Sequence, residues 1–278
     1  MALEKKILLI FSNCQGNYYK RILENFTNIN DFVDIKYLIS YENLNRFKEC
    51  KSFFETCDIL LINPIENHQD FLLENIKKYT KSSCVIIRLP FIRFNGFWLP
   101  EKYSLLKKFH SSIATNIPNI SIFSVDDYLS GLGLDKDLVE RHFNESIKKL
   151  QKIEDCCDIK FVEFFLQNYK RYALFKDEWH PTNYFYDYIA YEIIEIIKGY
   201  IPINNNFLVT YSNKKNFGHY SPINDKMKEI MGLEYDLDTY FIVSRKTYLS
   251  AILNYEENTD NSFVDNYNDF NKNVLKII

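Results

Sequence analysis

Short apolar runs alternate with amphipathic segments through the first ninety residues of the chain. Four of these runs have the length and the polar boundaries of buried strands, at 5–12, 33–39, 58–62 and 84–89. Between them, apolar residues recur at helical spacing over 17–26, 42–55 and 68–79. Strands that alternate with helices predict an α/β fold, with an open, mainly parallel sheet flanked by helices on both faces. A fifth strand is expected at 120–125.

Helical patterns dominate the second half of the chain. Residues 135–174 are amphipathic and contain neither Gly nor Pro, which predicts mainly helix. After a loop at 176–181, another helix is expected over 182–199, where Gly199 suits a C-cap. Beyond Tyr200 the sequence is rich in Asn, with helices expected near 222–232 and 244–256. We predict a catalytic α/β domain at 1–200 and a mostly helical C-terminal extension at 201–278 packed on it.

Composition narrows the class of protein. With only seven Gly and seven Pro among 278 residues, an all-β chain full of tight turns is disfavoured. A net charge of -3 provides no electrostatic footprint for nucleic acid, and we expect no nucleic-acid partner. No apolar run approaches the roughly 18 to 20 residues that span a bilayer, and the first one is too short for a signal peptide. A cytoplasmic protein is therefore expected, and the sequence leaves open whether it forms a homo-oligomer.

The cysteines show no spacing that would bind a metal ion, and we expect no metal site. The adjacent Cys156 and Cys157 match neither a CxxC redox motif nor a zinc knuckle. Five of the six cysteines are therefore interpreted as reduced thiols, mostly small buried apolar residues.

Cys14 is the exception, because it follows the first strand and precedes a helix. Ligands of open parallel sheets bind outside the carboxyl ends of the strands. A thiol at a helix N-terminus lies near backbone N–H groups that favour its anionic, nucleophilic form. The same N–H groups can hold a developing oxyanion. We therefore predict Cys14 as the catalytic nucleophile, against the alternative of an inert buried cysteine.

A second group of candidates lies in the loop from Asp177 to Thr182. Pro181 stops any preceding helix and fixes His180 in a rigid loop, where an imidazole can act as a general base. Asp177 lies three residues earlier and can hold the imidazole tautomer, as the acid of a catalytic triad does. Trp179 is predicted to contact the substrate. The alternative interpretation is a surface or helix-capping histidine.

Further candidates follow the third and fourth strands. Arg88 and Arg93 lie in an aromatic segment where arginine can bind phosphate, or Arg88 can instead form a structural ion pair. Asn63 can donate a hydrogen bond to an oxyanion or simply form a turn before Pro64.

The order of these residues resembles two known families. A nucleophile after the first strand and a late Asp-x-x-His-Pro resemble the SGNH/GDSL hydrolases, with Ser12-Asn13-Cys14 at the position of their Gly-Asp-Ser block. This implies an SGNH- or flavodoxin-like fold. The glycine and asparagine blocks of those hydrolases are not clearly present.

The sequence is more similar to the capsular-polysaccharide biosynthesis acetyltransferases of the WcbI type, over roughly residues 5–256. The resemblance rests on Asn13-Cys14-Gln15, Arg88-x-Pro90, Gly96-Phe97-x-x-Pro100, Glu154 to Asp158, Leu174-Phe175, His180-Pro181 and the stretch Pro222 to Tyr255. Where the family usually has Gly before Asn-Cys, this chain has Ser12.

This second resemblance implies transfer of an acetyl group from acetyl-CoA to a sugar hydroxyl of a surface polysaccharide precursor. It matches Cys14 and His180 to the catalytic residues, and Gln15 and Arg88 to ligand-binding residues. Gln15, Gly16, Arg88 and Arg93 together form the predicted CoA-binding set. Asn13, Asn63 and Trp179 are the residues predicted to contact the acceptor.

Two other functions fit the same residues. The first is a thiol-dependent esterase or deacetylase that uses water as the acceptor and needs no CoA. The second is a non-catalytic protein that binds CoA or a glycan. Fold alone does not decide between them.

Overall fold

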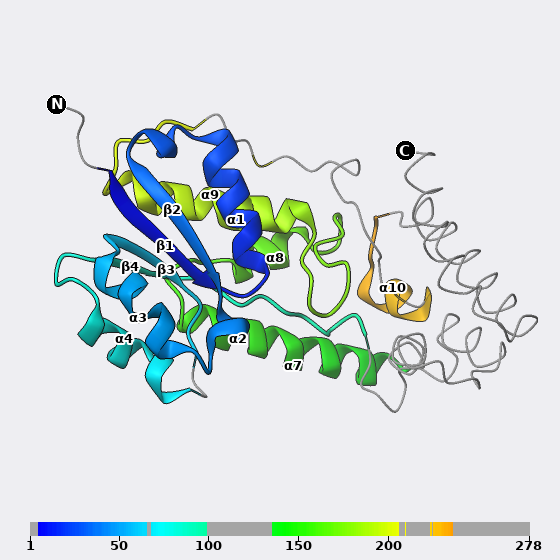
Figure 1. Cartoon of the computed structure of the whole chain (residues 1–278). Coiled ribbons are helices and arrows are strands. Elements are labelled where there is room, and N and C mark those ends of the chain that lie inside the picture. The colour runs from blue at the N-terminus through cyan, green and yellow to red at the C-terminus, as the bar shows by residue number, and fades with distance from the viewer. Residues whose placement is uncertain are drawn as a thin grey trace, which may run out of the picture. The chain divides into compact units, whose positions relative to one another are not determined.

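The protein is described from a computed structural model of the whole chain, which describes residues 5–65, 68–98, 135–205, 209, 223 and 225–235 (Figure 1). The chain divides into two compact units. The first unit comprises Met1–Arg93, Lys148–Leu166 and Asn183–Tyr211, and the second comprises Phe94–Ile147, Gln167–Thr182 and Ser212–Ile278. Each unit thus consists of three separate segments of the chain. The predicted boundary between a catalytic domain at 1–200 and an extension at 201–278 stays a prediction.

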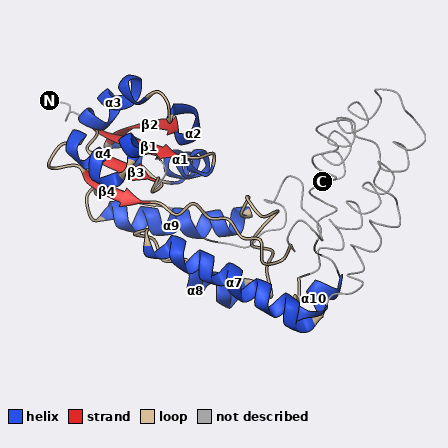
Figure 2. Cartoon of the chain, turned by 90° about the horizontal axis from the view of Figure 1, so that it is seen from below, coloured by secondary structure: helices blue, strands red, loops and turns tan. Residues whose placement is uncertain are grey.

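A four-stranded, all-parallel sheet lies in the first unit, and it confirms the predicted α/β class. Its strands are β1 (Lys6–Ser12), β2 (Val33–Ile39), β3 (Ile59–Ile62) and β4 (Val85–Arg88). They lie side by side in the order β2-β1-β3-β4 (Figure 2). The predicted strand at 120–125 falls outside the described residues.

The register of the sheet brings the ends of all four strands to one edge. Ser12 pairs with Ile39, Phe11 with Ile62, and Ile62 with Arg88. The residues that follow these positions therefore emerge together at the carboxyl edge of the sheet, where ligands of such folds bind.

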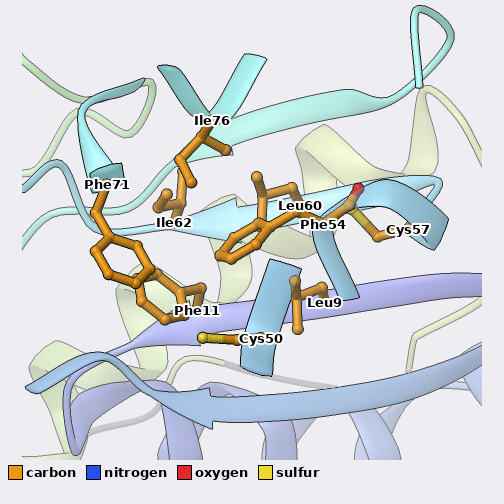
Figure 3. Close-up of a cluster of buried hydrophobic side chains, with 9 residues drawn as sticks. All are labelled: Leu9, Phe11, Cys50, Phe54, Cys57, Leu60, Ile62, Phe71 and Ile76. Carbon is orange, nitrogen blue, oxygen red and sulfur yellow. The ribbon is translucent and has the colours of Figure 1, made fainter. Parts of the chain in front are cut away.

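One face of the sheet packs against α3 (Phe47–Thr56) and α4 (Leu73–Tyr79). Side chains alternate between the two faces of a strand, so Leu9 and Phe11 point to this side. Figure 3 shows the resulting cluster, which also contains Cys50, Phe54, Cys57, Leu60, Ile62, Phe71 and Ile76. The Phe11 and Phe71 rings stack with their centroids 5.0 Å apart. These buried aromatic rings fix the helices on the sheet.

Two helices from distant parts of the sequence pack together beside the sheet, α1 (Gln15–Phe26) and α9 (Asn183–Lys198) (Figure 1). Each has a buried apolar stripe, with Ile22 and Leu23 on α1 and Ile189 and Ile193 on α9. The hydroxyl of Tyr18 donates a 2.6 Å hydrogen bond to the carboxyl of Asp187, which is buried in α9.

The predicted helix at 42–55 is interrupted. A single turn, α2 (Ser40–Asn43), precedes α3, and a tight turn separates them. The Asn43 side chain donates to the Ile39 carbonyl, and the Arg46 N–H donates to the Asn43 carbonyl. Asn competes for backbone hydrogen bonds in this way and so ends helices early. Two 3₁₀ turns also occur, η1 (Ile29–Asp31) and η2 (Gln69–Phe71), and α4 begins after the second.

The long helical stretch predicted at 135–174 divides into α7 (Lys136–Asp155) and α8 (Val162–Asn168). The Glu154 carboxylate accepts hydrogen bonds from the N–H groups of Phe161 and Val162, at 2.5 and 2.7 Å, and so caps the start of α8. The helix predicted near 222–232 is α10 (Asp225–Met231), followed by Gly232 at a φ of 60°. The helix expected near 244–256 lies outside the described residues.

Candidate functional site

A tight turn joins β1 to α1, and Cys14 lies on it. Ser12 ends the strand and Gln15 begins the helix. The Asn13 side-chain oxygen accepts the Gln15 N–H at 3.1 Å, while the Asn13 carbonyl accepts the Gly16 N–H at 3.0 Å. This Asn-centred turn caps the helix start and leaves the Cys14 thiol exposed.

Asn63, the residue after β3, connects the ends of three strands. Its side-chain oxygen accepts the Ser12 hydroxyl at 2.5 Å and the Asn13 N–H at 3.1 Å. Its amide nitrogen donates to the carbonyl of Leu89, just after β4, at 3.1 Å. Asn63 is only 5% exposed, so these hydrogen bonds form away from water. The arrangement makes Asn63 a positioning residue for the Cys14 turn.

Strand β2 contributes Tyr37. Its hydroxyl donates a 2.7 Å hydrogen bond to the carbonyl of Asn13. Burial, together with the neighbouring Cys14 and Tyr41, raises the pKa of Tyr37 to about 12, so the phenol stays a hydrogen-bond donor at neutral pH. The sequence analysis missed this residue, although its position near the end of the strand at 33–39 could have suggested it.

Gly16 is required by the close approach of strand and helix at this turn. A Cβ atom built on Gly16 would lie 2.6 Å from the Cβ of Ser12 and 3.0 Å from a ring carbon of Tyr37. Any larger residue would therefore push α1 away from the strand ends.

Gln15 holds the segment after β4. Its side-chain nitrogen donates to the Ile92 carbonyl at 2.8 Å, and its oxygen accepts the Ile92 N–H at 3.3 Å. The pair is buried, and the next residue, Arg93, is exposed. The predicted contacts of Gln15, Gly16 and Arg93 with a cofactor stay predictions.

The backbone amides of this turn differ in their hydrogen bonds. The N–H groups of Gln15 and Gly16 bind to Asn13, and that of Asn17 donates to the Cys14 carbonyl at 3.3 Å. Within the described part of the chain, the Cys14 N–H has no acceptor. It is the amide of this turn that can donate to an oxyanion formed beside the thiol.

Arg88 forms the ion pair that the sequence analysis left as an alternative. Its Nε and Nη2 atoms lie 3.0 and 2.5 Å from one carboxylate oxygen of Asp158, and its backbone N–H donates to the other at 2.7 Å. Burial opposes ionisation of Asp158, but the hydrogen bonds from Arg88 outweigh it and hold the pKa of Asp158 below its ordinary value. Asp158 is a second residue that the sequence analysis missed, within the Glu154 to Asp158 motif.

In the second unit, Asp177 and His180 lie in a closed loop. A bridge between Phe175 and Pro181 closes the loop, and the Lys176 N–H donates to the His180 carbonyl at 2.8 Å. The Asp177 carboxylate accepts the N–H groups of Trp179 and His180, at 2.7 and 2.9 Å. The loop conformation is therefore fixed by the carboxylate itself.

The His180 ring is oriented by the same carboxylate. Its Nδ1 lies 2.9 and 2.8 Å from the two oxygens of Asp177. A carboxylate can only accept, so the proton of the neutral ring lies on Nδ1 and Nε2 is left as the proton acceptor. Burial opposes ionisation of Asp177, but the hydrogen bonds from His180 and Trp179 prevail and hold the pKa of Asp177 below its ordinary value. The His180 side chain is about half exposed, with a side-chain relative exposure of 53%. This is the geometry of a general base held by an acid.

Trp179 offers an exposed aromatic face beside His180. Its ring nitrogen donates to the Glu178 carboxylate at 2.5 Å, and the Glu178 carbonyl accepts the Phe94 N–H at 2.9 Å. An exposed Trp held in this way can stack on a sugar ring, and its role toward the acceptor stays a prediction.

Eight of the ten predicted residues thus form two groups, whereas Arg88 pairs with Asp158 and Arg93 lies exposed. Asn13, Cys14, Gln15, Gly16 and Asn63 come together at the carboxyl edge of the sheet in the first unit. Asp177, Trp179 and His180 come together in the loop of the second unit.

Two kinds of feature are absent from the described residues. No group of three or more His, Cys, Asp or Glu side chains is placed to hold a metal ion there. No helix in that part of the chain has the length and apolar character needed to cross a membrane.

Comparison with known proteins provides one distant likeness. No protein-family model matches the sequence. Among solved structures, the chain is similar to WcbI, which is described as a novel polysaccharide biosynthesis enzyme. That structure is of the native protein, without a disulfide bond between CoA and one of its cysteines. The identity is 13%, the match covers 80% of this chain and 75% of WcbI, and the TM-score is 0.48.

Proposed function

We propose that this protein is an O-acetyltransferase that moves an acetyl group from acetyl-CoA to a sugar hydroxyl of a surface polysaccharide precursor. The observation that carries the proposal is the exposed Cys14 thiol on a turn held by Asn13, Asn63 and Tyr37. A nucleophile needs both access and a fixed direction of attack, and this turn supplies both. The resemblance of the sequence to the capsular-polysaccharide acetyltransferases names the donor and the acceptor.

In the first step, the Cys14 sulfur attacks the carbonyl carbon of acetyl-CoA. The carbonyl oxygen becomes an oxyanion, to which the Cys14 N–H can donate. The bond to the CoA sulfur then breaks, CoA leaves as a thiolate that takes up a proton, and the acetyl group remains on Cys14.

In the second step, the sugar hydroxyl attacks the acetyl group. His180 accepts the hydroxyl proton at Nε2, and Asp177 stabilises the imidazolium that forms. Cys14 leaves as the thiolate. In the alternative route, the hydroxyl attacks acetyl-CoA directly, with His180 again as the base and Cys14 as a binding residue.

Intact-mass measurement distinguishes the routes. The protein is incubated with acetyl-CoA without acceptor, and the mass is followed over time. Acetylation of Cys14, about 42 Da heavier, supports the covalent route. Cys14→Ala should abolish the modification and lower turnover at least about 1,000-fold. Cys156→Ala is the matched control, because Cys156 is the other exposed thiol, and it should leave both unchanged. If Cys14→Ala retains full turnover, Cys14 is not the nucleophile.

The base is tested in the same assay. His180→Gln should lower turnover about 100- to 10,000-fold while acetyl-CoA still binds. Asp177→Asn should lower it as well, because the amide no longer stabilises the imidazolium.

Calorimetry with CoA and acetyl-CoA tests the donor. Arg93→Ala should weaken binding, whereas Arg46→Ala, at the exposed pair with Glu49, should not. Arg88 is a poorer probe, because its substitution also removes the ion pair with Asp158. If CoA and acetyl-CoA do not bind at millimolar concentration while the protein hydrolyses an activated ester, the protein is an esterase and not a transferase. Binding that survives Cys14→Ala and His180→Gln without any turnover in the wild type would indicate a binding protein.

A further inference from the structure

Two cysteines at the opposite edge of the sheet lie in contact. The Sγ atoms of Cys57 and Cys84 are 3.7 Å apart, just before β3 and β4. Figure 3 shows Cys57 at the margin of the buried cluster, against which Cys84 packs. We propose that this pair is a peroxide-sensitive site, in which Cys84 is oxidised first and Cys57 then forms a disulfide with it.

The backbone around the pair already suits a disulfide. The Val85 N–H donates to the Asp58 carbonyl at 2.9 Å. The register of β3 and β4 therefore places Asp58 opposite Cys84, so Cys57 is offset from Cys84 by one residue along the neighbouring strand. Strand spacing and rise put their Cα atoms about 6 Å apart, within the range that disulfides span. Both side chains lie on the α3 and α4 face of the sheet, so the sulfurs need only close from contact to bonding distance.

The backbone is also held on each side of the pair. The Cys57 N–H donates to the Phe53 carbonyl at the end of α3, at 3.1 Å, and the Cys84 N–H donates to the Lys81 carbonyl at 2.9 Å. The two thiols therefore stay in register in the folded protein, which makes the second step intramolecular and fast.

The two thiols differ in reactivity. Cys57 is completely buried, with the Phe54 carbonyl 3.3 Å from its sulfur, whereas Cys84 is half-buried. The hydrogen bond between the two sulfurs lowers the pKa of Cys84, and together with burial it raises that of Cys57. Lys81 favours the Cys84 thiolate, and Asp58, paired with Lys81 at 2.8 Å, opposes it. Cys84 is thus the more accessible of the two thiols and the one whose ionisation the pair favours, so a peroxide reacts with it first.

The chemistry balances with a peroxide as oxidant. The Cys84 thiolate attacks one peroxide oxygen, an S–O bond forms, the O–O bond breaks, and the other oxygen leaves as hydroxide. The Cys57 sulfur then attacks the Cys84 sulfenic acid. An S–S bond forms, the S–O bond breaks, and the hydroxyl leaves with the Cys57 proton as water. The two sulfurs are oxidised, and hydrogen peroxide is reduced to two waters.

The proposal is independent of the proposed function. Cys57 and Cys84 precede their strands, whereas Cys14 follows β1. The Asp58 N–H donates to Ile7, so the pair lies level with the start of β1, and the strand from Ile7 to Ser12 separates it from the Cys14 turn by roughly 16 Å.

Peptide mapping of the folded, full-length protein tests the proposal. The protein is treated with hydrogen peroxide, the remaining thiols are alkylated, and the digest is analysed by mass spectrometry. The expected product is a peptide pair cross-linked through Cys57 and Cys84, lost after dithiothreitol. In Cys57→Ser, Cys84 should accumulate as a sulfenic acid that dimedone captures. In Cys84→Ser, Cys57 should stay unmodified. Cys50→Ser removes another buried thiol of the same cluster and should keep the cross-link.

The wild-type digest alone can overturn the proposal, whether or not each variant folds. Oxidation of the exposed Cys14 and Cys156 without a Cys57–Cys84 cross-link would exclude a reactive pair. A cross-link that appears only in urea would show that the folded protein does not form it. Faster oxidation of Cys57 than of Cys84 would reverse the assigned order.

Discussion

At the scale of single residues, Asn63 has the largest structural role near Cys14. One buried amide satisfies the Ser12 hydroxyl, the Asn13 N–H and the Leu89 carbonyl, three groups from two segments of the chain, at the end of β1 and after β4. Buried polar groups that lose their partner cost about 1 to 3 kcal/mol each, so the amide cannot be replaced without penalty. The position of the Cys14 backbone therefore depends on a residue about fifty positions away.

Asn63→Ala should lower the free energy of unfolding by about 3 kcal/mol, because it leaves these buried groups without a partner. Urea denaturation followed by circular dichroism measures the change. Asn25→Ala is the control, since the exposed Asn25 side chain makes a single bond to the Arg21 carbonyl. A loss no larger than that of the control would show that water replaces the Asn63 amide.

At the scale of elements, the Arg88–Asp158 pair fastens the end of β4 to the turn that follows α7. Backbone and side chain both take part, since the Asp158 N–H also donates to the Arg88 carbonyl at 3.0 Å. Each side chain is about one-third exposed, so solvent screening reduces its contribution.

This pair predicts a dependence of stability on pH. The pKa of Asp158 is lowered in the folded state, so its contribution is complete above the ordinary Asp pKa of about 3.9. It is lost as the pH falls through the lowered value. Urea denaturation of wild type and Asp158→Asn should differ by about 1 kcal/mol at pH 7, and the difference should shrink toward pH 3.

The control for the pH dependence is Glu49→Gln, at the exposed pair with Arg46, which should change little at any pH. A difference between wild type and Asp158→Asn that is the same at every pH would assign the effect to packing and not to charge.

The sequence predicted most of the sheet and fewer of the helix boundaries. The strand at 33–39 matches β2, and the runs at 58–62 and 84–89 contain β3 and β4, because buried parallel strands are nearly continuous apolar runs. The single helices predicted at 42–55 and 135–174 are each interrupted, by the Asn43 turn and by the Glu154 cap. Periodicity does not register a break made by one polar side chain.

The candidate site could be predicted in part. Placing Cys14 between a strand and a helix required only local pattern, and the structure confirms that placement. The long-range hydrogen bonds of Asn13, Gln15 and Asn63 could not be predicted, because their partners, such as Tyr37, Ile92 and Leu89, lie 24 to 77 residues away along the chain. A single sequence does not show which polar residues meet at the edge of a sheet. Tyr37 and Asp158 were missed for the same reason.

At the scale of the whole molecule, the first unit is assembled from segments far apart in the sequence. The hydrogen bond from Tyr18 to Asp187 joins α1 to α9 across 169 residues. The Tyr18 ring also stacks on Tyr186, with centroids 4.9 Å apart. Burial and the hydrogen bond to Asp187 raise the pKa of Tyr18, so the phenol remains a donor.

Tyr18→Phe keeps the ring and removes only the hydroxyl. Since the acceptor is a buried carboxyl, the free energy of unfolding should fall by about 1 to 2 kcal/mol, measured by urea denaturation. Tyr191→Phe, on the exposed side of α9, is the control and should have little effect. An equal loss in the two variants would show that the Tyr18 bond adds nothing specific.

The packing of α1 on α9 has a consequence for folding during synthesis. The apolar face of α1, with Tyr19, Ile22 and Leu23, is synthesised well before the α9 residues that join it, such as Ile189 and Ile193. At about 5 to 20 residues per second, that interval is on the order of 10 to 30 seconds. During it the face of α1 that packs on α9 in the folded protein lacks its partner. The last third of the chain therefore decides when the first third can finish folding.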